Sequence, residues 1–324
     1  MGVKVSVLAV DAGNSKTDVA LIGEDGTVLS TARGGGFQPP VVGVAAALDV
    51  VAGLVDRALA GAGREVDGVE HVSACLANVD LPVEEAELTE AVVGRGWGRT
   101  AEVRNDTFAI LRAGVDEPRG VAVVCGAGIN CVGMLPDGRT ARFPAIGKIS
   151  GDWGGGSGLA DEALWFAARA EDGRGGPTEL ARTLPAHFGL DSMYALIEAL
   201  HLGRIAFERR HELAPVLFAT AQGGDPVAVS LVERLADEVV AMASVALGRL
   251  ELLDVAAPVV LGGGVMAARH PQLDAMIAER FAARAPKAVV RVVTEPPVLG
   301  AALLGLDRTG APAEVHRRLR AQYS

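Results

Sequence analysis

Apolar residues near the start of this chain come in short runs separated by turn residues, and the same arrangement returns further along. The first copy spans Val7–Gly34 and the second spans Val121–Phe143. In each copy, one apolar run enters a small-residue turn, a second run leaves it, and an Asp-Gly turn leads to a third extended run. This order of strands and tight turns is a hairpin pattern. The sequence therefore predicts one supersecondary unit that is built twice.

After the first copy, the pattern alternates between helical spacing and extended runs. Helical spacing covers Val42–Ala62 and Glu84–Val93, and extended runs cover Val69–Leu76 and Ala101–Val103. This alternation predicts an α/β sheet covered by helices. The turn-rich segment Gly114–Gly120 then marks a boundary, and we expect an N-terminal lobe of residues 1–115 and a larger C-terminal lobe of residues 116–324.

The second lobe reads as mostly helical. A buried strand at Pro258–Leu261 leads into three glycines, and two further helices and a basic tail close the chain. The sequence leaves open whether the last helix packs on the N-terminal lobe. Four helices are expected before that strand, over Leu159–Ala170, Met193–Leu202, Glu212–Ala221 and Val227–Leu253.

Composition excludes several classes of function. A net charge of −10 leaves no basic surface for nucleic acid. No apolar run approaches the roughly 18–20 residues of a membrane span, and the N-terminus lacks a secretory signal pattern, so we expect a cytoplasmic protein with no membrane partner. Cys75, Cys125 and Cys131 lie in or beside apolar runs without CxxC or metal-ligand spacing, and we expect buried thiols.

The small-residue turns of the two copies have the composition of phosphate-binding loops. Asp11 ends the first run, where a carboxylate can hold Mg²⁺, since this ion takes one or two carboxylates together with water and phosphate oxygens. No GxxxxGK[ST] sequence occurs, so hairpin turns and not a P-loop would hold the phosphates. The candidate phosphate-binding residues are Gly13, Asn14, Ser15, Lys16 and Thr17 in the first turn and Gly126, Ala127 and Gly128 in the second.

A third glycine turn follows the late strand. Gly262, Gly263 and Gly264 open a GxGxxA sequence, which also fits a dinucleotide-binding fold. That fold normally places the sequence at its first strand–helix crossing, whereas here it comes late and after both hairpins. A turn that lies flat against adenosine fits better, and close packing of strand and helix is the alternative.

Five motifs in this order resemble the sugar kinase–Hsp70–actin superfamily, and more closely the family that unites BadF/BadG/BcrA/BcrD ATPases with N-acetylglucosamine kinases and bacterial glucosamine kinases. The resemblance covers Ala9–Leu303 and implies a two-lobed, ribonuclease H-like α/β fold with a duplicated βββαβα core and an interlobe cleft. It also implies that the hairpins bind ATP phosphates and that the late glycine turn binds adenosine. The motifs are AVDAGNSKTDVAL, RNDTFAILRAG, VVCGAGINC, GDWGGGSGLADEAL and VVLGGGV.

The resemblance assigns Asp106 as the catalytic base. In this family the aspartate of an N/T-D motif accepts the proton of the attacking sugar hydroxyl, a role that typically contributes about 10²–10⁴-fold. The alternative is a helix N-cap, because Thr107–Ala113 has a helical pattern and Asp is favoured at such a position.

The resemblance specifies the reaction more closely than the sugar. Asn78, Asn130 and Asp152 are candidates for binding the sugar hydroxyls, and Gln38 is a candidate for reading the C2 substituent. N-acetylglucosamine kinases are similar to one another in a Gly/Ser-rich turn ending in Asn, whereas this chain has Gln38 followed by two prolines. Because the chain resembles the bacterial glucosamine kinases more closely, we expect an ATP- and Mg²⁺-dependent glucosamine kinase, monomeric or homodimeric, that phosphorylates the 6-hydroxyl. N-acetylglucosamine is the second choice of sugar.

Other functions remain as alternatives within the same superfamily. BadF/BcrA-type activators carry an iron–sulfur cluster on cysteines of a C-A-A-G-T-G type motif, which this chain lacks. An actin- or Hsp70-type assembly module would need further subdomains, for which the chain is too short. The CxCGxxGC zinc motif of repressor-type sugar kinases is also absent.

Overall fold

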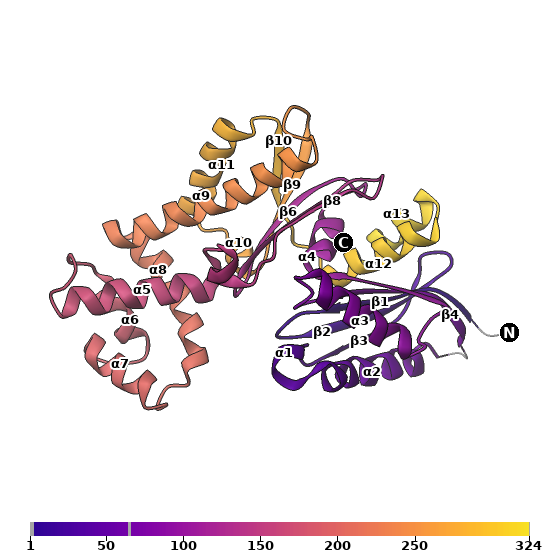
Figure 1. The fold of residues 1–324 in the computed structure, drawn as a ribbon, viewed down its shortest axis with the longest axis horizontal. Coiled ribbons are helices and arrows are strands. Elements are labelled where there is room, and N and C mark those ends of the chain that lie inside the picture. Colours follow the sequence, from indigo (N-terminus) through magenta and orange to yellow (C-terminus); the bar gives the residue numbers. More distant parts are fainter. Residues whose placement is uncertain (1–2, 64–65, 324) are drawn as a thin grey trace. The chain divides into compact units, whose positions relative to one another are not determined.

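The computed structural model describes residues 3–63 and 66–323 (Figure 1). The chain forms two compact units. The first unit combines Met1–Ala122, Val132–Pro144 and Arg291–Ser324, and the second combines Val123–Cys131 and Ala145–Val290. The lobe boundary between residues 115 and 116 stays a prediction, and the two units are described separately below.

Two five-stranded sheets share one strand order, which confirms the duplicated α/β core. The first sheet has the order β3-β2-β1-β4-β5 and the second β10-β9-β6-β7-β8. Read from its other end, the second sheet also places its third, second, first, fourth and fifth strands side by side. The strands are β1 Val3–Ala12, β2 Thr17–Gly23, β3 Val28–Gly34, β4 Val66–Leu76, β5 Thr100–Asn105, β6 Gly120–Cys125, β7 Ile129–Met134, β8 Thr140–Arg142, β9 Ala257–Gly262 and β10 Ala288–Val292.

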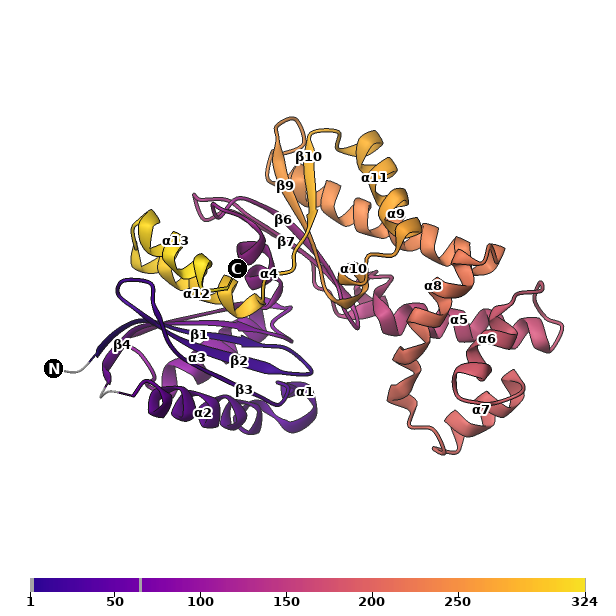
Figure 2. The ribbon, with the colours of Figure 1, turned by 180° about the vertical axis from the view of Figure 1, so that it is seen from behind.

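In the first sheet, β1 runs antiparallel to β2 and parallel to β4. Its side chains alternate between two faces. Leu8 and Val10 belong to the core beneath the helices α2 and α3, whereas Val7 and Asp11 point to the opposite face. Helices α4 and α12 cover that opposite face (Figures 1 and 2). The helices of the first unit are α1 Pro39–Val42, α2 Val44–Gly61, α3 Pro82–Gly94, α4 Thr107–Gly114, α12 Pro297–Thr309 and α13 Ala313–Ala321.

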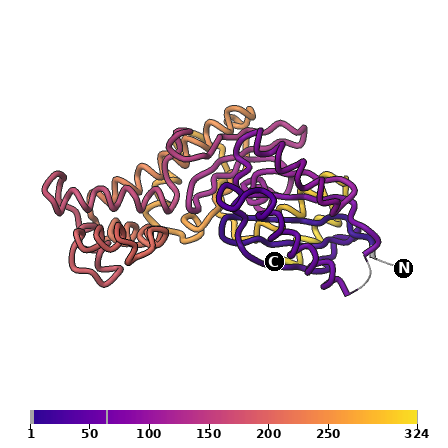
Figure 3. The backbone as a smooth tube through the Cα atoms, turned by 60° about the horizontal axis from the view of Figure 1, so that its bottom comes forward, coloured from indigo at the N-terminus to yellow at the C-terminus, as the bar shows by residue number. Residues whose placement is uncertain are grey.

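The C-terminal segment returns to the strands with which the chain begins. Figure 3 shows the yellow C-terminal segment beside the indigo N-terminal strands, and α12 packs against β1. The Gln322 carboxamide accepts from Val28 N at 2.9 Å and donates to Gly26 O at 2.9 Å. Helix α13 is therefore fastened to the Asp-Gly turn between β2 and β3.

The second unit is mostly helical, as the sequence predicts. Its long helix α9 begins where Asp225 accepts a hydrogen bond from Ala228 N at 2.8 Å, an N-cap that precedes Pro226. No helix in the described ranges combines the length and apolar content needed to cross a membrane. Its helices are η1 Gly147–Ser150, α5 Gly155–Glu171, α6 Leu180–His187, α7 Met193–His201, η2 Phe207–Glu212, α8 Leu213–Gln222, α9 Pro226–Arg249, α10 Gly264–Ala267 and α11 Pro271–Arg284.

Candidate active site

The turn between β1 and β2 is closed by its own backbone. Gly13 N donates to Lys16 O at 2.9 Å, and Gly13 O accepts from Phe37 N at 2.9 Å. Asn14, Ser15 and Lys16 are exposed at the tip. The turn therefore offers exposed donors on a fixed backbone, which is the arrangement expected of a phosphate-binding loop.

Three predicted site residues meet at this turn. Gln38 Nε2 donates to Asn14 O at 2.9 Å, and Asn78 Nδ2 donates to Asn14 Oδ1 at 3.0 Å. Asn78 has a left-handed backbone with φ of 62°. A Cβ on Gly36 would lie 2.0 Å from Asn14 O, so only glycine permits this approach. The amide nitrogen of Gln38 is thus used within the turn, which leaves its carbonyl oxygen as the part able to accept from a ligand.

Asp11 lies at the end of β1 and is only 6% exposed. Burial, together with the negative charges of Asp106 and Asp18, raises the pKa of its carboxyl to about 8. Lys16 and Arg33 oppose this shift. Close to Asp11 in the sequence, the hydroxyl of Thr17 is buried without a hydrogen-bond partner. This region of the first unit therefore holds a carboxyl whose ionised form is disfavoured and a hydroxyl without a hydrogen-bond partner.

Asp106 stands between β5 and α4, and its side chain makes no N-cap hydrogen bond. The neighbouring Asn105 carboxamide takes that role, because its Oδ1 accepts from Thr107 N at 2.9 Å in an Asx turn. Asn105 Nδ2 also donates to Asp80 Oδ1 at 2.9 Å. Burial raises the pKa of Asp106 to about 6, although hydrogen bonds from the Thr107 backbone and hydroxyl and from the Asp106 backbone oppose the shift. A carboxylate with this pKa suits proton acceptance near neutral pH.

The carboxylate of Asp11 suits a divalent cation. Within the described ranges, no three His, Cys, Asp or Glu side chains gather as a metal-binding group. Mg²⁺ does not need such a group, because it commonly takes one or two carboxylates and completes its shell with water and phosphate oxygens. Burial and the neighbouring carboxylates disfavour the ionised form of Asp11, and a bound cation would stabilise that form.

In the second unit, three glycine segments converge. The turn between β6 and β7 is closed by Gly126 N, which donates to Gly128 O at 2.9 Å. A Cβ on Gly155 would lie 2.4 Å from Ala127 O, and one on Gly263 would lie 2.4 Å from Cys125 O. Gly156 N and Ser157 N donate to Gly126 O and Ala127 O at 2.7 and 3.0 Å. The start of α5 and the turn before α10 therefore both touch the β6–β7 turn.

Asp152 and Asn130 also belong to the second unit, and each has local partners. Asp152 Oδ2 accepts from Gly147 N at 3.0 Å and from the Ser150 hydroxyl. Asn130 Oδ1 accepts from Cys131 N at 2.7 Å. The carboxylate of Asp152 thus holds its own loop around η1, and its predicted contact with the sugar stays a prediction.

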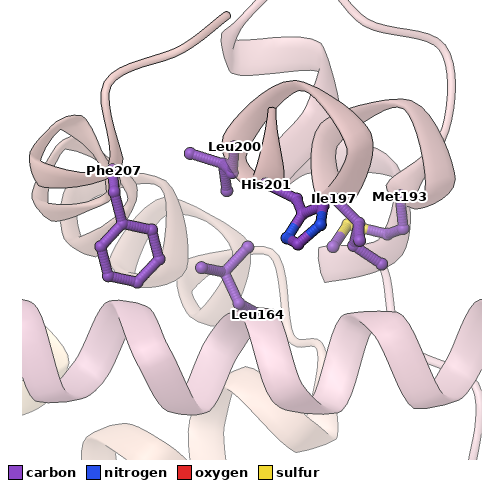
Figure 4. A pocket seen from close by; sticks show the side chains of 6 residues that line it. All are labelled: Leu164, Met193, Ile197, Leu200, His201 and Phe207. Carbon is purple, nitrogen blue, oxygen red and sulfur yellow. The ribbon is translucent and has the colours of Figure 1, made fainter. Parts of the chain in front are cut away.

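A separate cavity of about 480 Å³ lies among α5, α7 and η2 (Figure 4). Its lining is apolar apart from one imidazole, which does not suit a polyhydroxylated sugar. The lining residues are Leu164, Met193, Ile197, Leu200, His201 and Phe207.

The family description matches residues 8–305, which is nearly the whole chain. The chain belongs to the BadF/BadG/BcrA/BcrD ATPase family. This membership confirms the family that the five sequence motifs predicted. Both glycine hairpins, Asp11, Asp106 and the turn at Gly262–Gly264 lie within the matched range.

Named relatives of this BadF/BadG/BcrA/BcrD family member are sugar kinases. An N-acetylmuramic acid/N-acetylglucosamine kinase of Clostridium acetobutylicum is 26% identical over 72% of this chain and 76% of its own length. An N-acetyl-D-glucosamine kinase of Dictyostelium discoideum is 26% identical over 63% of this chain, and the match spans just under two thirds of that enzyme, 65%.

Solved structures support the two-lobed fold of this family member. A candidate N-acetylglucosamine kinase of Chromobacterium violaceum superposes with a TM-score of 0.71 at 24% identity, covering 93% of this chain and 99% of the other. A ROK family glucokinase of Streptomyces griseus, solved with glucose and AMPPNP, gives a TM-score of 0.52 at 19% identity, covering 92% and 98%. At these identities the likeness establishes the fold.

Several residues of this family member were missed by sequence reasoning. Asn105 starts α4 and connects it to Asp80, and its position before an Asp at a helix start is a signal that could have found it. Gly36 and Gly155 are required by close backbone approaches that join segments distant in sequence. No local pattern reveals such approaches.

Proposed function

We propose that this protein is an ATP- and Mg²⁺-dependent sugar kinase that transfers the γ-phosphate of ATP to the 6-hydroxyl of D-glucosamine. The kinase relatives and the sugar kinase fold support the enzyme class. The observation that carries the chemistry is the pair Asp11 and Asp106 in the first unit. They interact electrostatically, and burial raises the pKa of both carboxyls.

The two carboxylates divide the work in this proposal. Asp106 accepts the proton of the 6-hydroxyl as that oxygen bonds to the γ-phosphorus, and the bond from the γ-phosphorus to the bridging oxygen breaks to release ADP. Asp11 holds the cation, which when bound neutralises charge on the phosphate oxygens. The turns at Gly13–Thr17 and Gly126–Gly128 bind phosphates through backbone and side-chain donors, and Gly262–Gly264 lies against the adenosine.

The choice of glucosamine rests on the turn around Gln38. Because its amide nitrogen donates to Asn14 O, its carbonyl oxygen is the atom left to accept from the C2 substituent. An ammonium group at C2 would donate to this oxygen without needing a pocket for a methyl group. N-acetylglucosamine is the second candidate, and the names of the two curated relatives favour it.

The test is ADP release with Mg²⁺-ATP in the presence of glucosamine, N-acetylglucosamine, glucose or no sugar. Glucosamine should give the highest kcat/KM. The Asp106→Asn variant should bind ATP normally and lose about 10²–10⁴-fold in kcat. Asp56→Asn makes the same chemical change at an exposed carboxylate of α2 and should keep wild-type turnover.

Each other outcome selects a different reading. Turnover with N-acetylglucosamine alone would replace the proposed sugar and leave the kinase in place. ATP hydrolysis that ignores every sugar would favour an ATPase activator of the kind for which the family is named. Near-normal turnover by Asp106→Asn would remove Asp106 as the base.

A further inference from the structure

Helix α4, which begins directly after Asp106, lies in backbone contact with α12. A Cβ on Gly300 of α12 would lie 1.8 Å from Ala109 O and 2.8 Å from Ala113 N. No side chain fits in that space, so glycine is required where the two helices meet. Any residue larger than glycine at position 300 must push α4 away from α12.

The other side of α12 touches β1, the strand that carries Asp11. A Cβ on Gly305 would lie 2.4 Å from Val7 Cγ1 and 3.1 Å from Ser73 Cβ. Val7 lies in β1, four residues before Asp11 and on the same face of the sheet. Helix α12 thus contacts both the strand that carries Asp11 and the helix that begins after Asp106.

The far end of α4 is held by a buried ion pair. Arg112 is 1% exposed, and its Nε and Nη2 donate to the two oxygens of Asp307 in α12 at 2.6 and 3.0 Å. Its Nη1 donates to Val115 O at 2.8 Å. His316 of α13 bonds to Asp307 Oδ1 at 2.9 Å through Nε2. This network joins α4, α12 and α13.

Arg320 of α13 binds the carbonyl groups at the end of α4. Its Nη1 donates to Ala113 O at 2.8 Å and its Nη2 to Arg112 O at 3.0 Å and to Val115 O. The last carbonyls of a helix have no partner within the helix, so a side chain from another segment fixes this end in place. Three separate contacts therefore restrain a helix of only eight residues.

We propose that Gly300, Asp307 and Arg320 are positioning residues that set the location of Asp106 relative to Asp11, acting through α4. The inference rests on the proposed role of Asp106 as the base. Misplacement of a reacting group by about 1 Å can cost on the order of 10²-fold in rate. Restraint of α4 by the C-terminal helices would therefore appear in kcat and not in substrate binding.

The first experiment compares Gly300→Ala with Gly53→Ala. Gly300→Ala should lower kcat at least 10-fold, which is less than the roughly 10²-fold expected for a displacement of about 1 Å. KM for ATP and for the sugar should stay within about twofold of wild type. Gly53 is exposed in the middle of α2 with open space around its Cβ position, so Gly53→Ala should keep wild-type kinetics. Wild-type kcat in folded Gly300→Ala, or a loss no larger than its unfolded fraction, would overturn the inference.

Arg320→Gln provides a second variant in case Gly300→Ala fails to fold. It removes the guanidinium donors and should also lower kcat with unchanged KM. Hydrogen exchange gives a readout independent of activity, and amides of Thr107–Gly114 should exchange faster in both variants while those of α2 do not change. Unchanged exchange in α4 would show that these residues do not restrain the helix. That result would overturn the inference whether or not Asp106 is the base.

Discussion

At the scale of single residues, Asp11 is a buried carboxyl whose ionised form the fold disfavours. Burial and two neighbouring carboxylates raise its pKa to about 8, so its ionised form is disfavoured in the folded protein. A group whose pKa is raised on folding lowers stability as the pH rises from its unfolded to its folded value. In the proposed kinase, a bound cation would stabilise the ionised form that the unliganded fold disfavours.

Asp11→Asn should therefore stabilise the unliganded protein. The variant should unfold at higher denaturant than wild type at pH 8, by roughly 3 kcal/mol, and the difference should shrink toward pH 4. Denaturant unfolding without Mg²⁺ or nucleotide measures this, with Asp56→Asn as the control. Equal stability of wild type and Asp11→Asn at pH 8 would contradict the prediction. Mg²⁺-ATP should stabilise wild type and not Asp11→Asn.

At this scale, sequence was informative about residues whose role depends on local context. Asp11 and Asp106 stand at the end of a strand or the start of a helix, and a periodic pattern locates such positions. At Asp106 the resemblance favoured a catalytic base over a helix N-cap, and the structure assigns the helix-start hydrogen bond to Asn105. The unpartnered Thr17 hydroxyl was not foreseen, because its isolation depends on surrounding strands.

At the scale of elements, the second unit depends on glycines that allow three turns to touch. Gly155 begins α5 with a left-handed φ of 75°, against the carbonyl of Ala127. The N-terminal amides of α5 are used by the β6–β7 turn through Gly156 and Ser157. Helix α5 therefore fixes the shape of the β6–β7 turn, and a substitution at Gly155 should change the conformation of that turn.

Gly155→Ala should destabilise the protein by about 2–4 kcal/mol, because it combines a strained backbone with a steric clash. It should also raise KM for ATP. Gly158→Ala lies one turn further along α5, where nothing is within 4 Å of the added Cβ, and should stabilise by about 0.5–1 kcal/mol. Thermal unfolding and ATP titration of the pair measure both effects, and indistinguishable variants would refute the proposed role of the turn.

Elements with a clear apolar pattern were predicted well, including the short strands β5 and β9, and elements without one were missed. The expected helix at Glu84–Val93 corresponds to α3, Pro82–Gly94. Helix α6, Leu180–His187, was missed because a proline lies inside it and its apolar stripe is brief. Strand β10 was missed because most of its residues are exposed, so it lacks the apolar run that marks a buried strand.

At the scale of the whole molecule, the first unit is assembled from three separate stretches of chain. The pair Arg112 and Asp307 joins positions 195 residues apart. Burial alone would raise the pKa of Asp307, but hydrogen bonds from His316 and Arg112 outweigh it and lower the pKa. Its charged form therefore stabilises the fold above the ordinary pKa of aspartate, and this stabilisation is lost as the pH falls through the lowered value.

Asp307→Asn should lower the free energy of unfolding by about 3 kcal/mol at pH 7, because it leaves the buried Arg112 without a countercharge. The difference from wild type should narrow as the pH falls from about 4, the ordinary pKa of aspartate, through the lowered pKa of Asp307. Denaturant unfolding across this pH range provides the measurement, again beside Asp56→Asn. If the free energies of unfolding of wild type and Asp307→Asn differed by the same amount at every pH, the loss would come from the packing of the side chain and not from its charge.

The return of α12 to β1 also has a consequence for biosynthesis. Domains generally fold as units while the chain leaves the ribosome, N-terminal parts first. Here the strands translated first lack α12, which covers one face of their sheet together with α4, until Pro297–Thr309 has been translated. The second unit, contained within residues 123–290, can finish folding earlier. A ribosome stalled before residue 297 would therefore hold a folded insert inside an unfinished domain, whose exposed apolar sheet is a substrate for chaperones.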